Sequence, residues 1–402
     1  MTNEEFISQH LHDNVRDLAL RRTPEGVDPV WCLQQIEGWQ LASVKLPSWA
    51  AIEGMYFPPR LSLEQCSSEQ TAIYKRHIVE RLLPDNADRE KMADFTGGFG
   101  VDFSFLAPIF RHSLYVEKLQ HPCTIAQHNF SLLGLTGAEV IFADSIEENR
   151  LREQDFSFVF IDPARRDNAG RKTVAISDCT PDVTALLPQL LAHSKAVMIK
   201  LSPMLDIKQA LRELPHVSEV HVVSVKGECK ELLLVCEPES TKLTCYCTNL
   251  GTEDDMFITD GHDDSAPQST NASIATEITC GHYLYEPNAS VLKAGVQDML
   301  CQKYEVCKLH PMSNLFVSPY CVENFPGRCF KIINFSDFGK RNLKNMLSEL
   351  KQANLAIRNF PSTVAELRKR LKLKEGGDAY LFATTLSDNS HALILCNKVT
   401  RA

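Results

Sequence analysis

The sequence has no long hydrophobic run and no cysteine pair of the kind that binds zinc. None of its apolar runs approaches the roughly eighteen residues of a membrane span, and the N-terminal stretch is polar and acidic. We therefore expect no membrane segment and no signal peptide. The 14 cysteines include no C-x-x-C pair, and the closest two are Cys245 and Cys247. This pattern fits neither a zinc site nor a small disulfide framework, and it favours reduced thiols in the cytoplasm.

The motifs of three common enzyme classes are missing as well. The sequence contains no H-E-x-x-H, G-x-S-x-G or G-x-x-x-x-G-K-[ST] motif. Metalloprotease, α/β-hydrolase and P-loop chemistry therefore have no support, and we expect no metal ion. No internal repeat is present.

Basic residues are unevenly distributed along the chain. The formal net charge is −9, which argues against a nucleic-acid partner for the chain as a whole, because phosphates attract Lys and Arg. Between positions 328 and 374, however, there are twelve Lys and Arg but only three Asp and Glu. This asymmetry predicts a basic surface near the C-terminus.

The hydrophobic pattern divides the chain into four regions. Residues 1–85 are expected to be helical, because apolar positions recur at helical spacing. Residues 86–238 alternate short apolar runs with helix-like segments, which is typical of a mainly parallel α/β sheet covered on both faces. Residues 239–322 are expected to form a small domain with a long acidic loop at 251–273, and residues 323–402 a compact α/β module.

A glycine-rich stretch follows the first apolar run of the second region. In MADFTGGFGVDFSFLA (92–107) a strand is expected to end at Asp94, and Gly97, Gly98 and Gly100 precede a helix. A strand-to-helix turn of this kind brings the backbone close to a nucleotide-like ligand. Only Gly98 and Gly100 fit the G-x-G spacing of dinucleotide folds, so an ordinary glycine turn is the alternative.

The next three apolar runs also end in acidic residues. These are Glu117, placed to accept both hydroxyls of a ribose, Asp144, placed to accept an adenine amino group, and Asp162. Because open α/β sheets bind ligands at the carboxyl ends of their strands, the four carboxylates predict a nucleotide-like ligand there. Lys200 ends the fifth run and either reaches the same edge or extends into solvent.

These residues resemble the motifs of class I S-adenosylmethionine-dependent methyltransferases. The resemblance implies S-adenosylmethionine as the cofactor. The cofactor site that it implies consists of Asp94, Thr96, Gly97, Gly98, Gly100, Asp102, Glu117, Lys118, Asp144 and Ser145. The stretch DFTGGFGVD looks most like the D-x-T-x-G-x-G-x-D pattern of a ribosomal RNA guanine methyltransferase.

The chain as a whole is similar to a bacterial family in which such a Rossmann-like methyltransferase domain precedes a ferredoxin-like domain and a THUMP-like domain. LEQCSSEQTAIYK, YLYEPNASVLKAG and GGDAYLFATTL carry this similarity. It implies a ferredoxin-like domain at 239–322, a THUMP-like domain at 323–402, and tRNA or rRNA as the partner of the basic module. The expected phosphate contacts are Lys340, Arg341, Lys344, Arg368, Lys369 and Arg370.

The acceptor motif departs from the common pattern. Amino-group methyltransferases of nucleic acids often carry [DN]-P-P followed by an aromatic residue that stacks on the base. Here the run is Asp162-Pro163-Ala164-Arg165. Arg165 either stacks on a base, holds a phosphate or belongs to a solvated turn. We expect Asp162, Pro163, Arg165 and Lys200 to serve methyl transfer to RNA; a methyltransferase for a small molecule or protein, and a non-catalytic RNA adaptor, are the alternatives.

Other polar groups have ordinary structural interpretations. Ser67, Ser68 and Glu69 are expected to cap a helix, with a fold over the cofactor as the alternative. Asn288 begins a helix expected over 288–304 and is interpreted as a cap. KGECK (226–230) is interpreted as a solvated hairpin turn.

Overall fold

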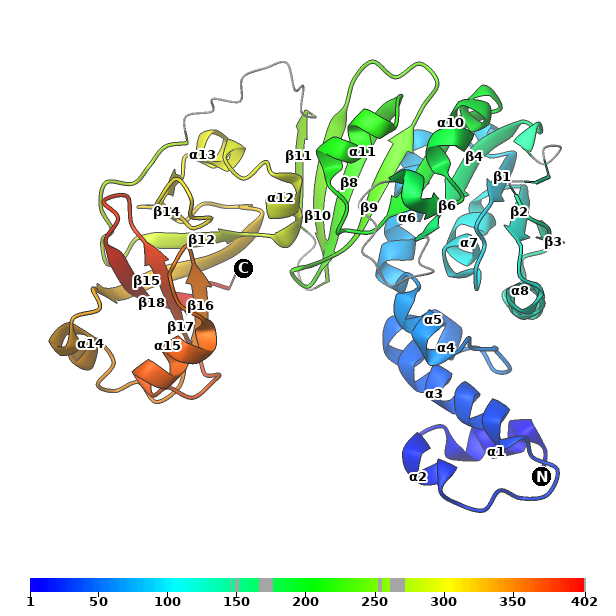
Figure 1. Ribbon diagram of the computed structural model, residues 1–402, viewed down its shortest axis with the longest axis horizontal. Helices are drawn as coiled ribbons and strands as arrows, with labels where there is room; N and C mark the ends of the chain where they lie inside the picture. The colour runs from blue at the N-terminus through cyan, green and yellow to red at the C-terminus, as the bar shows by residue number, and fades with distance from the viewer. Residues whose placement is uncertain (146, 149–151, 166–175, 252–254, 261–271, 401–402) are drawn as a thin grey trace. The chain divides into compact units, whose positions relative to one another are not determined.

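A computed structural model describes residues 1–145, 147–148, 152–165, 176–251, 255–260 and 272–400 (Figure 1). The chain divides into two compact units: unit 1 is Met1–Val220 with Glu231–Leu243, and unit 2 is His221–Lys230 with Thr244–Ala402. The division passes through the neighbouring strands β8 (Val217–Val225) and β9 (Glu228–Cys236).

The N-terminal part of unit 1 is helical, as the sequence predicts. Its helices are α1 (Asn3–His10), α2 (Val15–Ala19), α3 (Pro29–Lys45), α4 (Pro47–Ala50), α5 (Arg60–Gln65) and α6 (Glu69–Leu82). The Asp28 side chain begins α3 by accepting the amides of Val30 and Trp31, and Pro29 occupies a first-turn position that needs no amide donor. Trp49 is buried and donates to Ser104 Oγ at 3.2 Å. This bond joins the helical region to the sheet domain that follows.

Unit 1 also contains a mainly parallel sheet, which confirms the Rossmann-like fold. Its strands are β1 (Lys91–Asp94), β2 (His112–Glu117), β3 (Ala138–Phe142), β4 (Phe156–Ile161) and β7 (Ser194–Leu201), with β9 at one side. The order is β9-β7-β4-β1-β2-β3, and only β9 runs antiparallel to its neighbour β7 among these pairs. Every residue of β4 is buried, as expected for a strand covered on both faces.

Helices and short elements connect these strands. They are η1 (Asn86–Asp88), α7 (Val101–Leu106), η2 (Ala107–Ile109), α8 (Gln120–Leu132), β5 (Ala164–Arg165), η3 (Ile176–Asp178), β6 (Cys179–Thr180), α10 (Val183–Ala192) and α11 (Ile207–Glu213). Asp182 and Asp206 cap α10 and α11 by accepting backbone amides of the first turn. The strand–helix alternation expected for residues 86–238 is therefore present.

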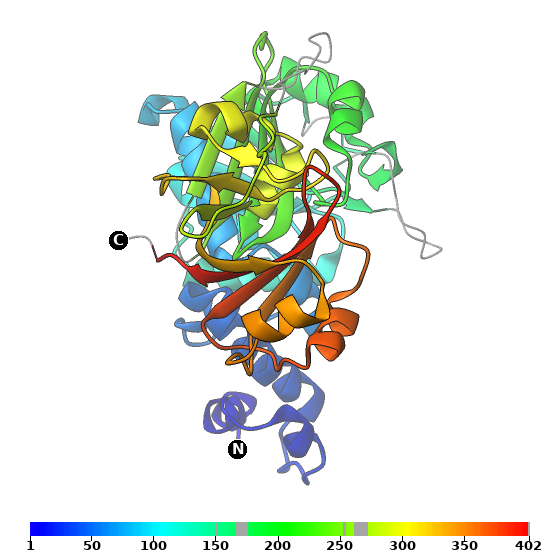
Figure 2. The same cartoon turned by 90° about the vertical axis from the view of Figure 1, so that its left-hand side faces the viewer.

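Unit 2 is built around a seven-stranded sheet. Its strands are β12 (Tyr283–Pro287), β13 (Cys307–Lys308), β14 (Phe316–Ser318), β15 (Gly327–Ser336), β16 (Asn354–Arg358), β17 (Ala379–Thr385) and β18 (His391–Lys398), in the order β13-β14-β12-β15-β18-β17-β16. Figure 2 shows α14 (Lys340–Met346) and α15 (Val364–Leu371) on one side of this sheet. Their Leu343 and Leu367 pack there with Leu381 and Leu393. Phe330 and Phe382 belong to a separate cluster.

Two expectations for the middle of the chain are wrong. The helix expected over 288–304 is divided into α12 (Ala289–Ala294) and α13 (Met299–Tyr304), because Gly295 ends α12 with a left-handed φ of 73°. The loop expected at 251–273 contains β11 (Asp255–Asp260), which pairs antiparallel with β10 (Thr244–Leu250). Residues 252–254 and 261–271 of that stretch lie outside the described residues.

The described residues also show how the chain stands with respect to membrane spans, metal-binding groups and disulfides. Across the described ranges, no helix combines the length and apolarity needed to span a bilayer. The same ranges hold no group of three or more His, Cys, Asp or Glu side chains able to bind a metal ion. All fourteen cysteines fall within the described part of the chain, and all are free thiols.

Candidate functional site

A cavity of about 570 Å³ opens at the carboxyl ends of the parallel strands of unit 1. Its lining includes Asp94, Thr96, Gly97, Gly98, Gly100, Asp102, Glu117, Lys118, Asp144, Ser145, Asp162 and Lys200. The expected site residues therefore lie together, except for Pro163, which is buried outside the lining, and Arg165, whose side chain falls outside the described part of the structure. The volume is within the range of cofactor sites.

The glycine turn is packed tightly against the neighbouring strand and helix. A Cβ at Gly97 would lie 2.2 Å from the buried ring of Tyr115, and a Cβ at Gly100 would lie 2.7 Å from the ring of Phe130. Gly98 is not crowded in this way; its φ of 56° accounts for the glycine. The turn thus holds its backbone in one conformation at the edge of the cavity.

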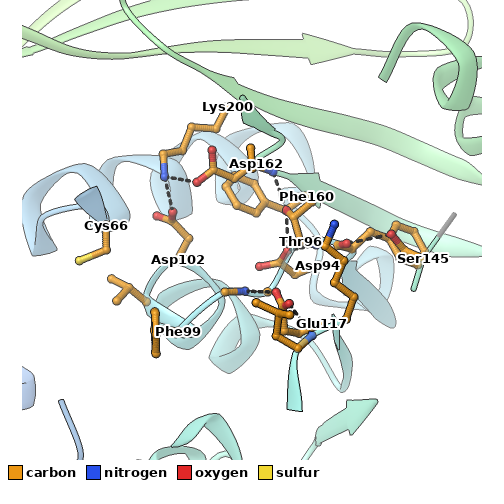
Figure 3. Close-up of a pocket in the computed structure, with 18 of the residues that line it drawn as sticks. Cys66, Asp94, Thr96, Phe99, Asp102, Glu117, Ser145, Phe160, Asp162 and Lys200 are labelled. Carbon is orange, nitrogen blue, oxygen red and sulfur yellow. Dashed lines mark hydrogen bonds and ion pairs between the residues drawn. The ribbon is translucent and has the colours of Figure 1, made fainter. Parts of the chain in front are cut away.

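Thr96 ties the end of β1 to the end of β4. Its amide and hydroxyl donate to Asp94 Oδ1 at 2.9 and 3.2 Å, and its hydroxyl oxygen accepts the Asp162 amide at 2.6 Å (Figure 3). Burial raises the pKa of Asp94 to about 8, against the lowering effect of the Thr96 amide. Asp94 therefore retains its proton at neutral pH.

Glu117 is fixed at the cavity by two backbone amides. Its Oε2 accepts from the amide of Gly98 at 3.0 Å, and its Oε1 accepts from the amide of Leu119 at 2.8 Å. Each carboxylate oxygen keeps a second lone pair, so the side chain can still accept two ligand hydroxyls. Beyond β3, Ser145 Oγ donates to the Phe95 carbonyl at 3.0 Å, which fastens the loop that carries Asp144 to the glycine turn.

A chain of alternating charges runs from the protein interior to the cavity. The Lys75 ammonium, on α6, is fully buried and lies 2.8 Å from the Glu231 carboxylate and 3.0 Å from Asp102 Oδ1. Asp102 Oδ2 lies 3.1 Å from the ammonium of Lys200, which in turn lies 2.5 Å from Asp162 Oδ2. Figure 3 shows Lys200 pointing between Asp102 and Asp162. Asp162 is the most exposed member, with 41% of its side chain accessible.

The pairing fixes the charges of the central members of this chain. Burial alone would raise the pKa of Asp102, but Lys200, Lys75 and a hydrogen bond from Ser67 together hold it well below its ordinary value. Burial alone would lower the pKa of Lys200, but the neighbouring carboxylates of Asp102 and Asp162 raise it well above the usual range. Lys200 is therefore an ammonium that donates hydrogen bonds, and it is not available as a base.

Sequence reasoning missed Lys75 and Glu231. Lys75 carries a recognisable signal, because it lies on the face of α6 that also buries Ala72, Ile78 and Val79. A lysine on an apolar face requires an anionic partner. Glu231 carries little signal, because it only begins a buried run of β9.

Ser67, Ser68 and Glu69, at the start of α6, each have a different role. Ser68 caps the helix as expected, with its Oγ accepting the amide of Thr71 at 3.3 Å. Ser67 lines the cavity, and its hydroxyl donates to Asp102 Oδ2 at 2.8 Å. Glu69 accepts from the amide and hydroxyl of Ser48, both at 2.8 Å.

Comparisons with known proteins show which family the chain belongs to. The family described as ferredoxin-like domain matches residues 283–326, and the family described as THUMP domain-like matches residues 327–398. No curated protein matches the sequence. The crystal structure of a protein from Porphyromonas gingivalis W83, provisionally described as a methyltransferase, is 32% identical with a TM-score of 0.84, and the match covers 99% of this chain and 98% of that chain.

Two other solved structures are much more distant. An rRNA methylase from Streptococcus thermophilus is 14% identical, with 40% of this chain and 94% of that chain covered and a TM-score of 0.31. A SAM-dependent methyltransferase from Agrobacterium tumefaciens is 16% identical, with coverage of 42% and 61% and a TM-score of 0.31. Neither bears on function here. On the full-length match and the two matched domains, the chain belongs to the bacterial family of class I methyltransferase-fold proteins that carry a ferredoxin-like and a C-terminal THUMP-like domain.

Proposed function

We propose that this protein is an S-adenosylmethionine-dependent methyltransferase that acts on a base in structured RNA, either tRNA or rRNA. One observation carries the proposal: Glu117, Asp144 and Asp162, which follow or end three parallel strands, line one cavity beside the glycine turn. Open α/β sheets bind nucleotide-like ligands at this edge. The family's full-length relative, provisionally described as a methyltransferase, agrees with this activity.

The lining residues suit S-adenosylmethionine. Glu117 would accept the two ribose hydroxyls through the lone pairs that its amide donors leave open. Asp144 would accept the adenine amino group, and the turn at Gly98 would lie against the rest of the cofactor. The bound cofactor supplies a methyl group that is already activated by a positive sulfur, so the protein has to align the reactants rather than activate them.

Asp162 is the residue that we assign to the acceptor. Its backbone is fixed by the Thr96 hydroxyl and by the buried strand β4, and Lys200 holds one carboxylate oxygen. The other oxygen can accept a hydrogen bond from an amino group of the acceptor and so direct the nitrogen lone pair toward the methyl group. Asp102 and Lys75 act behind Lys200, as positioning residues.

The basic C-terminal helices support RNA as the acceptor. Five of the expected phosphate-binding residues are exposed on α14 and α15: Lys340, Arg341, Lys344, Lys369 and Arg370. Arg368 differs from the expectation, because it is partly buried and donates to the Ala353 carbonyl at 3.3 Å. Exposed Lys and Arg side chains on one pair of helices are suited to phosphate contacts.

Transfer of labelled methyl tests this function. The protein is incubated with methyl-labelled S-adenosylmethionine and an extract of cells that lack the gene, and label is measured in the RNA, protein and small-molecule fractions. We expect label in a discrete tRNA or rRNA species. Label in protein or in a small molecule would instead indicate a methyltransferase for that class of acceptor. Binding of the cofactor without any methyl transfer would indicate a non-catalytic RNA adaptor.

A further inference from the structure

Unit 2 contains a second cavity, of about 500 Å³, that none of the expected site residues line. It is bounded by β12 and the residues that follow it, by the first residues of β15, by the end of β16 and by the tight turn at Lys226–Gly227. All of its lining residues belong to the same unit. The turn KGECK, interpreted from the sequence as an ordinary solvated hairpin, thus forms part of a cavity wall.

The charges that line this cavity are mainly positive. Lys226, Arg328, Arg358 and Lys398 contribute four cations, and Glu286 contributes one anion. Among the residues that the structure describes, neither lysine ammonium has an ion-pair or hydrogen-bond partner. Like charges around one cavity repel each other, so an excess of three positive charges favours an anionic ligand.

Glu286 is buried and orients both arginines. Only 4% of the residue is exposed. Its Oε2 accepts from Arg328 Nε at 2.9 Å and also from Arg328 Nη2, while its Oε1 pairs with Arg358 Nη2. Arg328 lies opposite Glu286 in the β12–β15 ladder, and Gly327 lets the strands approach closely, because a Cβ there would be 2.2 Å from the Glu286 carbonyl oxygen. One carboxylate therefore sets the orientation of two guanidinium groups.

Further contacts restrict the two arginines. The Arg328 guanidinium lies over the ring of Phe330 at 5.4 Å, and Arg358 Nη1 donates to the Ile357 carbonyl at 2.7 Å. The arginine side chains are nevertheless 47% and 37% exposed, so their remaining N–H groups can reach a ligand. One arginine is enough to neutralise the single charge of Glu286. The presence of two therefore leaves one positive charge that can pair with an anionic ligand.

We propose that this cavity binds a phosphate group, held by Arg328 and Arg358 with Lys226 and Lys398 as further cations. A planar guanidinium donates two parallel hydrogen bonds to a phosphate, and this geometry makes arginine the preferred residue for such sites. The source that we assign is a phosphate of the RNA acceptor, and this part rests on the proposed function. A free phosphate-bearing small molecule offers the same chemistry and is separated from RNA by the test.

The first experiment uses inorganic phosphate as the probe. Calorimetry on the full-length protein at constant ionic strength should give saturable binding. Arg358→Gln should weaken it about tenfold to a hundredfold, the range expected when charged hydrogen bonds are removed. Arg358→Gln removes one of the two cations that pair with the buried Glu286, so it can also destabilise the protein. Lys398→Gln is a second variant that leaves the Glu286 pairs intact, and it should also weaken phosphate binding. Lys331→Gln removes an exposed charge from β15 outside the cavity and is the matched control.

The outcomes test separately whether the phosphate site exists and whether its phosphate comes from RNA. Absence of saturable phosphate binding, or equal weakening by Lys331→Gln, would overturn the site. If RNA is the source, Lys398→Gln should reduce the slope of log affinity for tRNA or rRNA against log salt by about 0.7 to 1. An unchanged slope in Lys398→Gln, together with weaker binding of inorganic phosphate, would reject RNA as the source and assign the site to a free phosphate ligand. Phosphate binding through these arginines in a protein that transfers no methyl to RNA would refute the proposed function and leave the site intact.

Discussion

The ammonium of Lys200 lies 2.5 Å from Oδ2 of Asp162 at the cavity of unit 1. The carboxylate that we assign to the methyl acceptor is therefore already oriented by a fixed cation. Asp102 holds that cation from the other side, 3.1 Å away, and Lys75 holds Asp102 from the interior. The orientation of this carboxylate thus depends on an ion network whose other members lie on β7, α7 and α6, while Asp162 itself directly follows β4.

Asp162→Ala should abolish most methyl transfer while leaving cofactor affinity within a few-fold of wild type. The side chain aligns the acceptor and is not assigned to the cofactor, so we expect the rate to fall by about a hundredfold or more, as for other losses of alignment. Single-turnover transfer and calorimetric titration of S-adenosylmethionine measure the two effects. Asp155→Ala is the control, because Asp155 is 95% exposed just before the start of the same strand. Full activity, or loss of cofactor binding, would each contradict the assignment.

Asp102→Asn should destabilise the protein by about 3–5 kcal/mol, because it leaves two buried ammonium groups short of an anion. Since the folded pKa of Asp102 is lowered from 3.8, its contribution is present above that value and is lost as the pH falls through the folded pKa. Urea unfolding at neutral pH measures the effect. Asp88→Asn breaks an exposed pair with Lys195 and should cost no more than about 0.5 kcal/mol. Similar losses in both variants would mean that the buried network adds no special stability.

Asp94 should make the protein less stable as the pH rises from about 4 to 8. Its pKa is 3.8 in the unfolded chain and about 8 in the folded protein, so the folded state retains a proton that the unfolded state releases. The stabilisation is complete below 3.8 and declines through this window by up to about 1.4 kcal/mol per pH unit. The side chain of Asp94→Asn cannot ionise, so the variant lacks this loss of stability. The unfolding free energy of the variant should therefore rise relative to that of the wild type between pH 5 and 8. Parallel pH profiles for the two proteins would show that Asp94 is ionised when folded.

The exposed basic helices should give RNA binding a strong salt dependence. Replacing Lys340, Arg341 and Lys344 together by Gln should reduce the slope of log affinity against log salt by about 0.7 to 1 for each phosphate that the variant no longer binds. Fluorescence anisotropy with labelled tRNA or rRNA fragments measures the slope. Lys303, on α13, is exposed and outside both helices, so Lys303→Gln should leave the slope unchanged. An affinity insensitive to salt in the wild-type protein would rule out this binding mode.

The sequence predicts the location of the site better than its internal chemistry. Asp94, Glu117, Asp144 and Asp162 could be assigned to one edge because parallel strands bring their carboxyl ends together, a rule that depends only on local pattern and order. The ion pair between Lys75 and Glu231 could not be predicted in this way, because 156 positions separate the two residues. Its existence depends on where α6 packs, which no local spacing specifies.

The errors in the second half of the chain also arise where the local sequence pattern does not specify the structure. Helical periodicity extended across Gly295, but a left-handed glycine ends a helix regardless of the apolar pattern on either side. The partnership of Glu286 with Arg328 follows from the register of β12 and β15, which their sequences do not show. Arg368 was grouped with its basic neighbours, yet its position on α15 directs it to the Ala353 carbonyl.

Calorimetric titration of S-adenosylmethionine into wild-type protein and Glu117→Ala tests the central claim most directly. The claim is that the carboxyl edge of the unit 1 sheet holds this cofactor, with Glu117 as the acceptor of its ribose hydroxyls. We predict one saturable site in the wild type and an affinity about ten- to hundredfold lower in the variant, because two hydroxyls lose their acceptor. No binding to the wild type, or equal affinity in Glu117→Ala, would contradict the account.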